Sequence, residues 1–221
     1  MLEIYNTPKG CKDVFHAFLV EKASYDGDEE IPCIKTSKLI PEKVITFSKA
    51  LKTTNYNQWV VFYEHDDQFV RLWNKPRKYL NILKKFNGII TPDFSLYRNM
   101  PLVMQKWSTY QGKAIGAWLQ SEGIEVIPNV RFADERTYSF CFNGIEKQST
   151  VAIGTHGCIK KLTDRAYFEK GLAEMINQLQ PHTIIVYGAA PDNIFGKYKE
   201  MGITIIQFDS EFADIHKVVS A

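Results

Sequence analysis

The sequence predicts one main α/β domain of about seven mainly parallel strands alternating with helices. From Val44 onward, short apolar runs rich in β-branched and aromatic residues recur, and segments of helical length separate most of them. Most runs are continuous rather than alternating, which is typical of strands buried on both faces of a parallel sheet. The strands and the helices between them span about 165 residues, from Val44 to Phe208, which is below the roughly 200 residues of a closed eight-unit barrel. We therefore expect an incomplete or distorted (βα) barrel, with an open doubly wound sheet as the alternative.

The strands and helices are predicted from these runs and their spacing. The predicted strands are Val44–Phe47, Trp59–Tyr63, Gly88–Thr91, Glu125–Val130, Thr150–Ile153, Thr183–Tyr187 and Ile203–Phe208. The predicted helices are Phe69–Phe86, Met100–Ser121, Arg165–Leu179 and Asp192–Glu200. Pro76 predicts a break in the first helix, because proline is favoured at the first helical position and disfavoured inside. Thr163 and Asp164 are predicted to cap the third.

The first 43 residues have a different character, with an acidic loop at Asp26–Glu30 and no strand–helix alternation. We expect residues 1–43 to form an N-terminal extension packed on the main body, and residues 44–221 to form the single α/β domain. The chain start has no secretory signal, and no apolar run approaches the roughly 20 residues of a membrane helix. The cysteines, which lack metal or disulfide spacing, are predicted to be free thiols in a cytoplasmic protein: Cys11, Cys33, Cys141 and Cys158.

Charge is unevenly distributed along the chain. The segment 71–120 holds nine basic residues and one acid, so it carries +8 although the whole chain carries +2. The basic segment 71–113 is a candidate for contact with a nucleotide or a nucleic-acid backbone. The alternative is that these side chains cover solvent-exposed faces of two helices.

Polar residues follow the ends of the predicted strands. They lie in the segments Glu64–Asp67, Pro92–Tyr97, Pro128–Glu135, Gly154–Gly157 and Tyr187–Gly188. The carboxyl ends of parallel strands share one edge of the sheet, where ligand sites of such folds are built. The sequence therefore predicts a binding site at this edge, although loops after strands are also polar because they meet water.

Three residues are the main candidates for that site. Asp93 follows a proline at a strand end, where it could act as a base, bind a substrate hydroxyl, cap the next helix or join an ion pair. Asn129 and Arg131 lie two apart, on the same side of an extended chain. Arg131 could clamp a phosphate or carboxylate through two N–H groups, or pair internally with Asp93, Asp134 or Glu135.

Two turns could bind an anion. The turn Gly154–Gly157 places Thr155 and the titratable His156 between two glycines. The segment Tyr187–Asn193 joins a strand to a helix through small residues, although neither a P-loop nor a Gly-x-Gly-x-x-Gly motif is present. Cys158 is read as a core thiol, with a nucleophile as the alternative. No metal site is predicted. The alternative is a carboxylate–histidine site, which no short ligand spacing supports, from His65, Asp66, Asp67, Asp93 and His156.

Several longer motifs resemble a known family. They are Thr91–Tyr97 with Met100 and Pro101, Ile127–Arg131 with Asp134–Arg136, and Val151–Cys158. From about Ile40 to Phe208 the chain resembles the uncharacterised bacterial and phage family called domain of unknown function 4417. The resemblance implies a phage or mobile-element context, with roles such as nucleic-acid transactions or interference with host defence, and implies no particular reaction.

These observations give two hypotheses for function. The first is a protein that binds a phosphate-bearing ligand, a nucleotide or nucleic-acid end, at the carboxyl edge and hydrolyses it in the enzymatic version. Asp93 and His156 are then the candidate acid–base residues. The candidate ligand-binding residues are Asn129, Arg131, Asp134, Glu135, Thr155 and Tyr187, with Asp134 and Glu135 supporting Arg131. The second hypothesis is a non-catalytic protein that sequesters a ligand or engages a partner protein.

Overall fold

The computed structural model describes residues 12–210. The beginning of the predicted N-terminal extension, with Cys11, and the last 11 residues of the predicted α/β domain lie outside this range. Its main strands are β3 (Val44–Thr46), β4 (Trp59–Val61), β5 (Gly88–Ile90), β6 (Val126–Ile127), β7 (Thr150–Gly154), β8 (Thr183–Tyr187) and β9 (Thr204–Phe208). All neighbouring pairs among them are parallel. Each predicted strand is present, generally shorter than predicted because strand pairing ends where the loops diverge.

The strands follow one another in space as they do in the chain. One sheet has the order β3-β4-β5-β6 and the other β7-β8-β9, and a parallel bridge between Asn129 and Ala152 joins their edges. An order without reversal, built from crossovers of one hand, places the helices on one face, as in a barrel. Within residues 12–210, β3 does not pair with β9, so no closed barrel forms. The predicted α/β class is confirmed, and the strand order favours an incomplete barrel over a doubly wound sheet.

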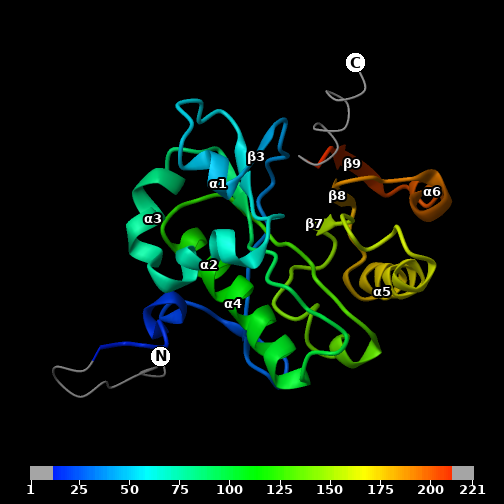
Figure 1. Ribbon diagram of the computed structural model, residues 1–221, viewed down its shortest axis with the longest axis horizontal. Coiled ribbons are helices and arrows are strands. Elements are labelled where there is room, and N and C mark those ends of the chain that lie inside the picture. Colours follow the sequence, from blue (N-terminus) through cyan, green and yellow to red (C-terminus); the bar gives the residue numbers. More distant parts are fainter. Residues whose placement is uncertain (1–11, 211–221) are drawn as a thin grey trace.

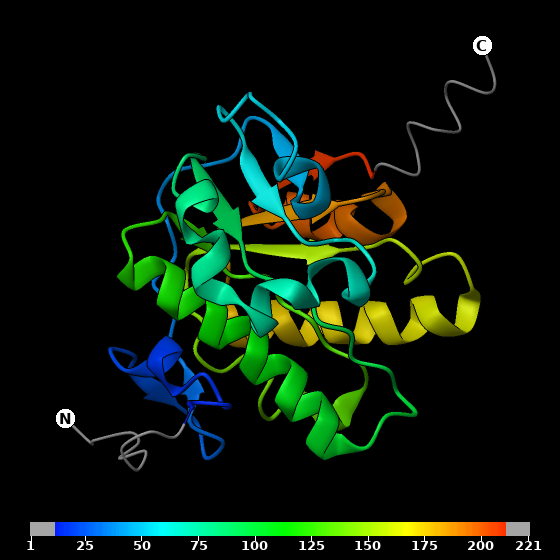
Figure 2. The ribbon, with the colours of Figure 1, turned by 60° about the vertical axis from the view of Figure 1, so that its left-hand side comes forward.

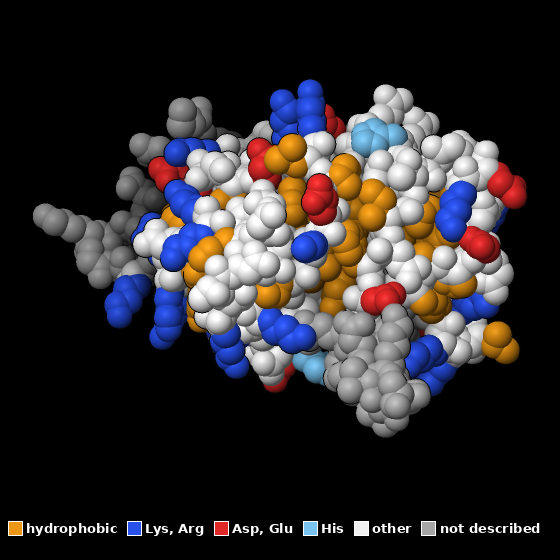
Figure 3. Space-filling model, turned by 90° about the horizontal axis from the view of Figure 1, so that it is seen from above, with side chains coloured by type: hydrophobic (Ala, Val, Ile, Leu, Met, Phe, Trp, Pro, Cys, Tyr) orange, Lys and Arg blue, Asp and Glu red, His pale blue; other side chains and the backbone are white. Residues whose placement is uncertain are grey.

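The strands curl around an apolar interior. One cluster, formed by Trp59, Val61, Ile90, Ile127, Ala152, Ile185 and Tyr187, lies on the face of the sheets away from the helices. Tyr63, just after β4, stacks on Tyr187 of β8, which requires the sheets to curve toward each other. Figures 1 and 2 show the strands between one group of helices, α1 to α4, and a second group, α5 and α6. Seen from above, apolar side chains reach the surface in the middle of the molecule (Figure 3).

The helices cover the outside of the curled sheets. They are η1 (Ala17–Val20), α1 (Phe47–Ala50), α2 (Asp66–Asn74), α3 (Pro76–Leu83), α4 (Leu102–Ser121), η2 (Glu135–Thr137), α5 (Leu162–Leu179) and α6 (Asp192–Glu200). The break predicted at Pro76 is confirmed, since α2 ends before it and α3 begins with it. The predicted start of α5 is wrong: the helix begins at Leu162, so Thr163 and Asp164 lie in its first turn instead of capping it. There Asp164 faces the positive end of the helix dipole and pairs with Arg98.

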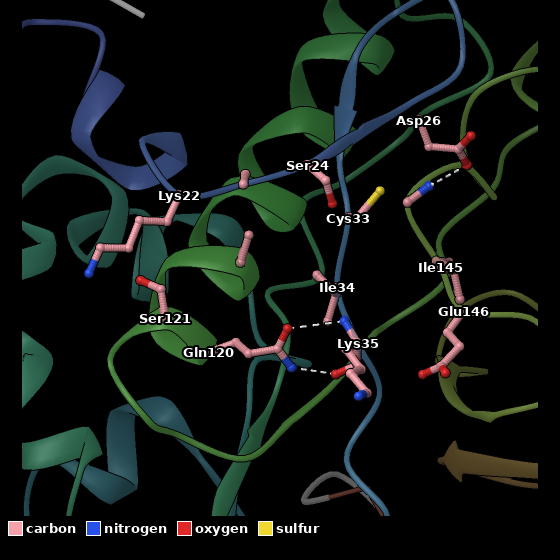
Figure 4. A pocket seen from close by; sticks show the side chains of 13 residues that line it. Lys22, Ser24, Asp26, Cys33, Ile34, Lys35, Gln120, Ser121, Ile145 and Glu146 are labelled. Atoms are coloured by element: carbon pink, nitrogen blue, oxygen red, sulfur yellow. Dashed lines mark hydrogen bonds between the residues drawn. The ribbon is translucent and has the colours of Figure 1, made fainter. Parts of the chain in front are cut away.

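The described part of the N-terminal segment packs against α4 and the loop after η2. It contains a short antiparallel pair that was not predicted, β1 (Tyr25–Asp26) and β2 (Ile31–Pro32). The side-chain amide of Gln120 on α4 bonds the backbone of Lys35 twice, because its oxygen accepts from the Lys35 N–H and its nitrogen donates to the Lys35 carbonyl (Figure 4). The Asp26 carboxylate accepts from the Gly144 N–H at 2.9 Å. These contacts surround a cavity of about 470 Å³. The division of the chain at residue 43 stays a prediction.

Gly144 is required where this segment meets the main body. Its φ is +70°, and a Cβ there would overlap the Pro32 carbonyl oxygen. We expect Gly144→Ala to lower the free energy of unfolding by about 2 kcal/mol, from the left-handed backbone and the clash together. Gly123→Ala is the matched control, because Gly123 has φ +85° but nothing within 4 Å of the added Cβ. Chemical denaturation measures both, and equal losses would show that the Pro32 contact is unimportant.

Candidate functional site

The carboxyl edge of the strands brings together Asp93, Asn129 and Arg131. The Asn129 side-chain amide donates to Asp93 Oδ1 at 2.7 Å, and Arg131 Nη1 lies 3.5 Å from Asp93 Oδ2. The Asn129 backbone N–H donates to the Thr91 hydroxyl at 2.8 Å, which ties the segment after β6 to the end of β5. Asn129 and Arg131 therefore lie on the same side of the chain, as their spacing predicts, and both hold one carboxylate.

Tyr63 completes this network from the opposite side. Its hydroxyl donates to Asn129 Oδ1 at 2.9 Å, which leaves the amide nitrogen of Asn129 for Asp93. Its ring stacks on Tyr187, with 4.8 Å between centroids and 13° between planes. Gly154 permits the approach, because a Cβ there would lie 2.9 Å from the Tyr63 ring. The network therefore joins residues that follow β4, β5 and β6 to Tyr187, the last residue of β8.

Burial and charge oppose each other at Asp93. Its side chain is 13% exposed, and burial raises the pKa of its carboxyl group, with Asp66 adding to the rise. The Arg131 guanidinium and the Asn129 amide act in the opposite direction and favour the carboxylate. The same carboxylate raises the pKa of Arg131, and burial raises that of Tyr63 well above its usual value. Arg131 thus remains charged and Tyr63 remains a hydrogen-bond donor.

A pocket of about 740 Å³ opens beside this network. We call it the carboxyl-edge pocket. It is lined by His65, Ser95, Leu96, Tyr97, Arg98, Asn99, Arg131, Phe132, Ala133, His156, Gly157, Cys158, Asp164, Tyr167 and Phe168. Arg131 connects the network to the pocket, since its side chain is 26% exposed and its Nη1 also contacts Cys158 Sγ at 3.8 Å.

Two sets of side-chain contacts position the loop between β5 and α4 on the pocket wall. The Asp66 carboxylate, in the first turn of α2, accepts from the backbone N–H and the hydroxyl of Ser95 at 3.1 and 2.9 Å. Arg98 pairs with Asp164 at 2.7 Å and lies over the Tyr167 ring, 4.4 Å from its centroid. The loop thereby holds a second guanidinium on the pocket wall, in addition to Arg131.

The second predicted acid–base residue, His156, lies on the wall of the same pocket as Arg131. Burial lowers the pKa of His156, and the nearby Lys160 and His65 lower it further. The imidazole is therefore neutral near pH 7. Asp93, Arg131 and His156 consequently share one edge of the fold, as the positions of the strand ends predict.

The other four predicted ligand-binding residues do not line the carboxyl-edge pocket. Thr155 is 1% exposed and its hydroxyl donates to the Ala189 carbonyl at 2.8 Å, while Tyr187 is 4% exposed beneath Tyr63. The predicted support of Arg131 by Asp134 and Glu135 is wrong. Asp134 caps η2 and pairs with Arg136 at 2.9 Å, and Glu135 is exposed on that 3-10 turn. Asp134 and Glu135 do not support Arg131 because both belong to the 3-10 turn that begins directly after Ala133, where Asp134 pairs with Arg136.

The basic segment 71–113 does not form one continuous charged surface. Three of its cations pair with acids from other parts of the chain, namely Lys84 with Glu122, Arg98 with Asp164 and Lys106 with Glu29. Lys113 is buried and only 3% exposed. Counting charge along a sequence window missed these partners, which come from more distant segments.

Sequence reasoning missed Tyr63 and Arg98 as pocket or network residues. Tyr63 was placed at the end of a strand run, and its hydroxyl after four apolar residues was the available signal. Arg98 follows the recognised segment Pro92–Tyr97 by one position. Among the described residues, no group of three or more His, Cys, Asp or Glu side chains is arranged to hold a metal ion, and Cys33, Cys141 and Cys158 are free. No helix between residues 12 and 210 is long and apolar enough to span a bilayer.

The fold and pocket define an α/β protein with a polar site at the carboxyl ends of parallel strands. The chain belongs to the family described as Domain of unknown function (DUF4417), whose model matches residues 23–209. This confirms the resemblance drawn from the sequence motifs, and it extends the match to residue 23, into the segment that resembled the family less. No solved structure matches the chain.

Phage proteins are among its relatives. The chain is 42% identical to the Gene 1 protein of Mycobacterium phage L5 over 127 residues, which cover 58% of this chain and 56% of that protein. It is 38% identical to the Gene 1 protein of Mycobacterium phage D29 over 127 residues, covering 58% of this chain and 47% of the relative. The match thus spans about half the length of these curated relatives.

Proposed function

We propose that this chain is a phage-associated protein that binds a phosphate-bearing small molecule of the nucleotide class in the carboxyl-edge pocket. The observation that supports this most is the placement of Arg131, whose Nη1 lies 3.5 Å from Asp93 while the side chain stays 26% exposed. A guanidinium fixed by one carboxylate keeps further N–H groups for a second anion. The phage origin of the Gene 1 relatives supports the phage association.

The size and lining of the pocket also support a nucleotide. Its volume of about 740 Å³ lies within the usual range for small-molecule sites, roughly 300–1,000 Å³. Arg98 adds a second guanidinium, and Tyr97, 57% exposed, and Tyr167, 37% exposed, offer aromatic rings on which a base could stack.

In the enzymatic version of the proposal, Asp93 or His156 acts as the general acid or base of a hydrolysis reaction. A neutral imidazole can accept a proton, and the pKa of His156 is lowered in the direction that keeps it neutral at pH 7. Asp93 has the opposite shift, toward a carboxyl group that donates. Saturable binding without release of phosphate would instead identify the non-catalytic binding protein.

The proposal is tested by calorimetry with nucleoside mono-, di- and triphosphates and with short 5′-phosphorylated DNA and RNA. We expect Arg131→Lys to weaken binding by about 1.5–3 kcal/mol, roughly 10- to 150-fold, because lysine keeps the charge and loses the planar fork. Phosphate release, followed in parallel and abolished by His156→Asn, would establish hydrolysis.

Arg77→Lys is the control, because Arg77 lies over the Phe18 ring on α3 and does not line the pocket. The affinity of this variant should equal that of the unmodified protein. The proposal fails if no member of the panel binds, or if Arg131→Lys and Arg77→Lys bind equally well.

A further inference from the structure

A second, much smaller cavity lies behind the carboxyl-edge pocket, between α4 and the ends of β5 and β6. Its volume is about 20 Å³, enough for one particle of the size of a water molecule. It is lined by Thr91, Pro92, Phe94, Leu96, Ser108, Thr109, Gly112, Lys113, Asn129, Arg131 and Cys141. It shares Arg131 and Leu96 with the larger pocket.

Three buried polar atoms of its lining have no hydrogen-bond partner among residues 12–210: Lys113 Nζ, Thr109 Oγ1 and Arg131 Nε. Thr109 and Lys113 lie four residues apart on α4, so they share one face of the helix. Lys113 is 3% exposed and Thr109 is 9% exposed. Leaving a buried donor unpaired is costly, by about 1–3 kcal/mol and more for a charged group. Three such donors around one small space indicate that an acceptor belongs there.

The charges around the cavity favour an anionic acceptor. Lys113 and Arg131 are cationic groups, and no carboxylate lines the space. Asp93 does not line this cavity and already pairs with Arg131 through Nη1. The thiols of Cys141 and Cys33 are the groups that interact with Lys113, but burial raises the pKa of Cys141 to about 12, so that thiol is neutral at pH 7. Among residues 12–210, therefore, no carboxylate lines the cavity beside Lys113, and Lys113 Nζ has no hydrogen-bond partner.

The geometry points to a binding site for one small monovalent anion of the halide type, held by Lys113 Nζ, Thr109 Oγ1 and Arg131 Nε. The anion accepts hydrogen bonds from all three donors and compensates the buried ammonium. A phosphate group is too large for this cavity, so the site is distinct from the proposed nucleotide site. The anion would also hold α4 against the strand ends from which Asn129 and Arg131 extend.

The test is thermal unfolding at pH 6 in halide-free buffer, with sodium chloride or sodium bromide titrated against sodium gluconate at equal ionic strength. We expect a saturable rise in melting temperature with the halides and none with gluconate, since a ligand bound only by the native state stabilises it. Lys113→Met should abolish the difference, and Thr109→Val should weaken halide affinity several-fold while keeping the charge. At pH 9, where the pKa of Lys113, lowered to about 7 by burial, leaves the amine neutral, the halide effect should nearly vanish.

Lys106→Met is the control, because Lys106 lies on the same helix but pairs with Glu29 at its surface. It should keep the full halide effect. In bromide-grown crystals, an anomalous peak within hydrogen-bond distance of Lys113 Nζ is expected. Equal responses to chloride and gluconate, a halide effect that survives in Lys113→Met, or a water molecule in place of bromide would each overturn the inference.

Discussion

Replacing Arg131 by alanine is expected to lower the free energy of unfolding by about 2–4 kcal/mol at pH 7. Asp93 is 13% exposed and would keep only the Asn129 amide as a partner for its charge. Removing one member of a fully buried ion pair costs about 3–5 kcal/mol, and the partial exposure of Arg131 reduces this cost.

This loss should depend on pH in a definite direction. Burial already raises the pKa of Asp93 in the folded protein, and losing Arg131 raises it further. When a carboxyl group has a higher pKa in the folded state than in the unfolded state, the free energy of unfolding of the protein falls as the pH rises between these two pKa values. The difference between Arg131→Ala and the unmodified protein should therefore be largest at neutral pH and shrink toward pH 4. Urea denaturation at several pH values measures it.

Two further variants identify the cause. Adding Asp93→Asn to Arg131→Ala should recover most of the loss, because a neutral amide needs no counterion. Lys199→Ala, which removes the exposed partner of the exposed Asp192, should leave stability almost unchanged. An equal loss in Arg131→Ala at pH 4 and pH 7, with no recovery by Asp93→Asn, would contradict the ion-pair explanation.

Replacing Lys113 by methionine is expected to stabilise the protein by about 2–4 kcal/mol below pH 7 in halide-free buffer. Burial lowers the pKa of Lys113 from 10.5 to about 7, a shift that would correspond to about 5 kcal/mol if nothing else solvated the ammonium. Methionine has a similar length and needs no hydrogen bonds. A water molecule or an ion in the cavity reduces the gain.

The pH range of this effect follows from the two pKa values of Lys113. Below about pH 7 both the folded and the unfolded states carry the charge, and the full cost of burial applies. Between pH 7 and 10.5 only the unfolded state is protonated, so the stability of the unmodified protein rises with pH. The advantage of Lys113→Met should therefore disappear near pH 10. Lys106→Met, on the same helix, should show no such pH dependence, and a destabilised Lys113→Met at pH 6 would contradict the prediction.

The repeated strand–helix pattern was sufficient to predict the main elements. Strand runs such as Thr183–Tyr187 were recognised because continuous apolar residues are needed where both faces of a strand are buried. Pro76 marked the boundary between α2 and α3 because proline removes a helical donor. The start of α5 was misplaced because Asp164 can stabilise a helix either as a cap or within its first turn. The β1–β2 pair was missed because it is two residues long in each strand.

The candidate site was only partly predictable. Strand ends pointed to Asp93, Arg131 and His156, because parallel strands bring their carboxyl ends to one edge whatever their order. Strand ends cannot distinguish a side chain at a pocket from one packed below it, as Thr155 and Tyr187 illustrate. The choice of partner for each charge also needed coordinates.

The sequence alone determined the α/β class, the number and location of the main strands and the family, since these depend on local apolar periodicity and on short motifs. The tertiary structure alone decided that Arg131 pairs with Asp93 and that Lys84 and Lys106 are paired with distant acids. It also decided that Lys113 Nζ is buried without a hydrogen-bond partner in the described part of the chain. Such outcomes depend on which residues the folded chain brings within a few ångströms of each other. Desolvation and pairing at that range set the charge of a side chain, and the linear order of residues does not contain them.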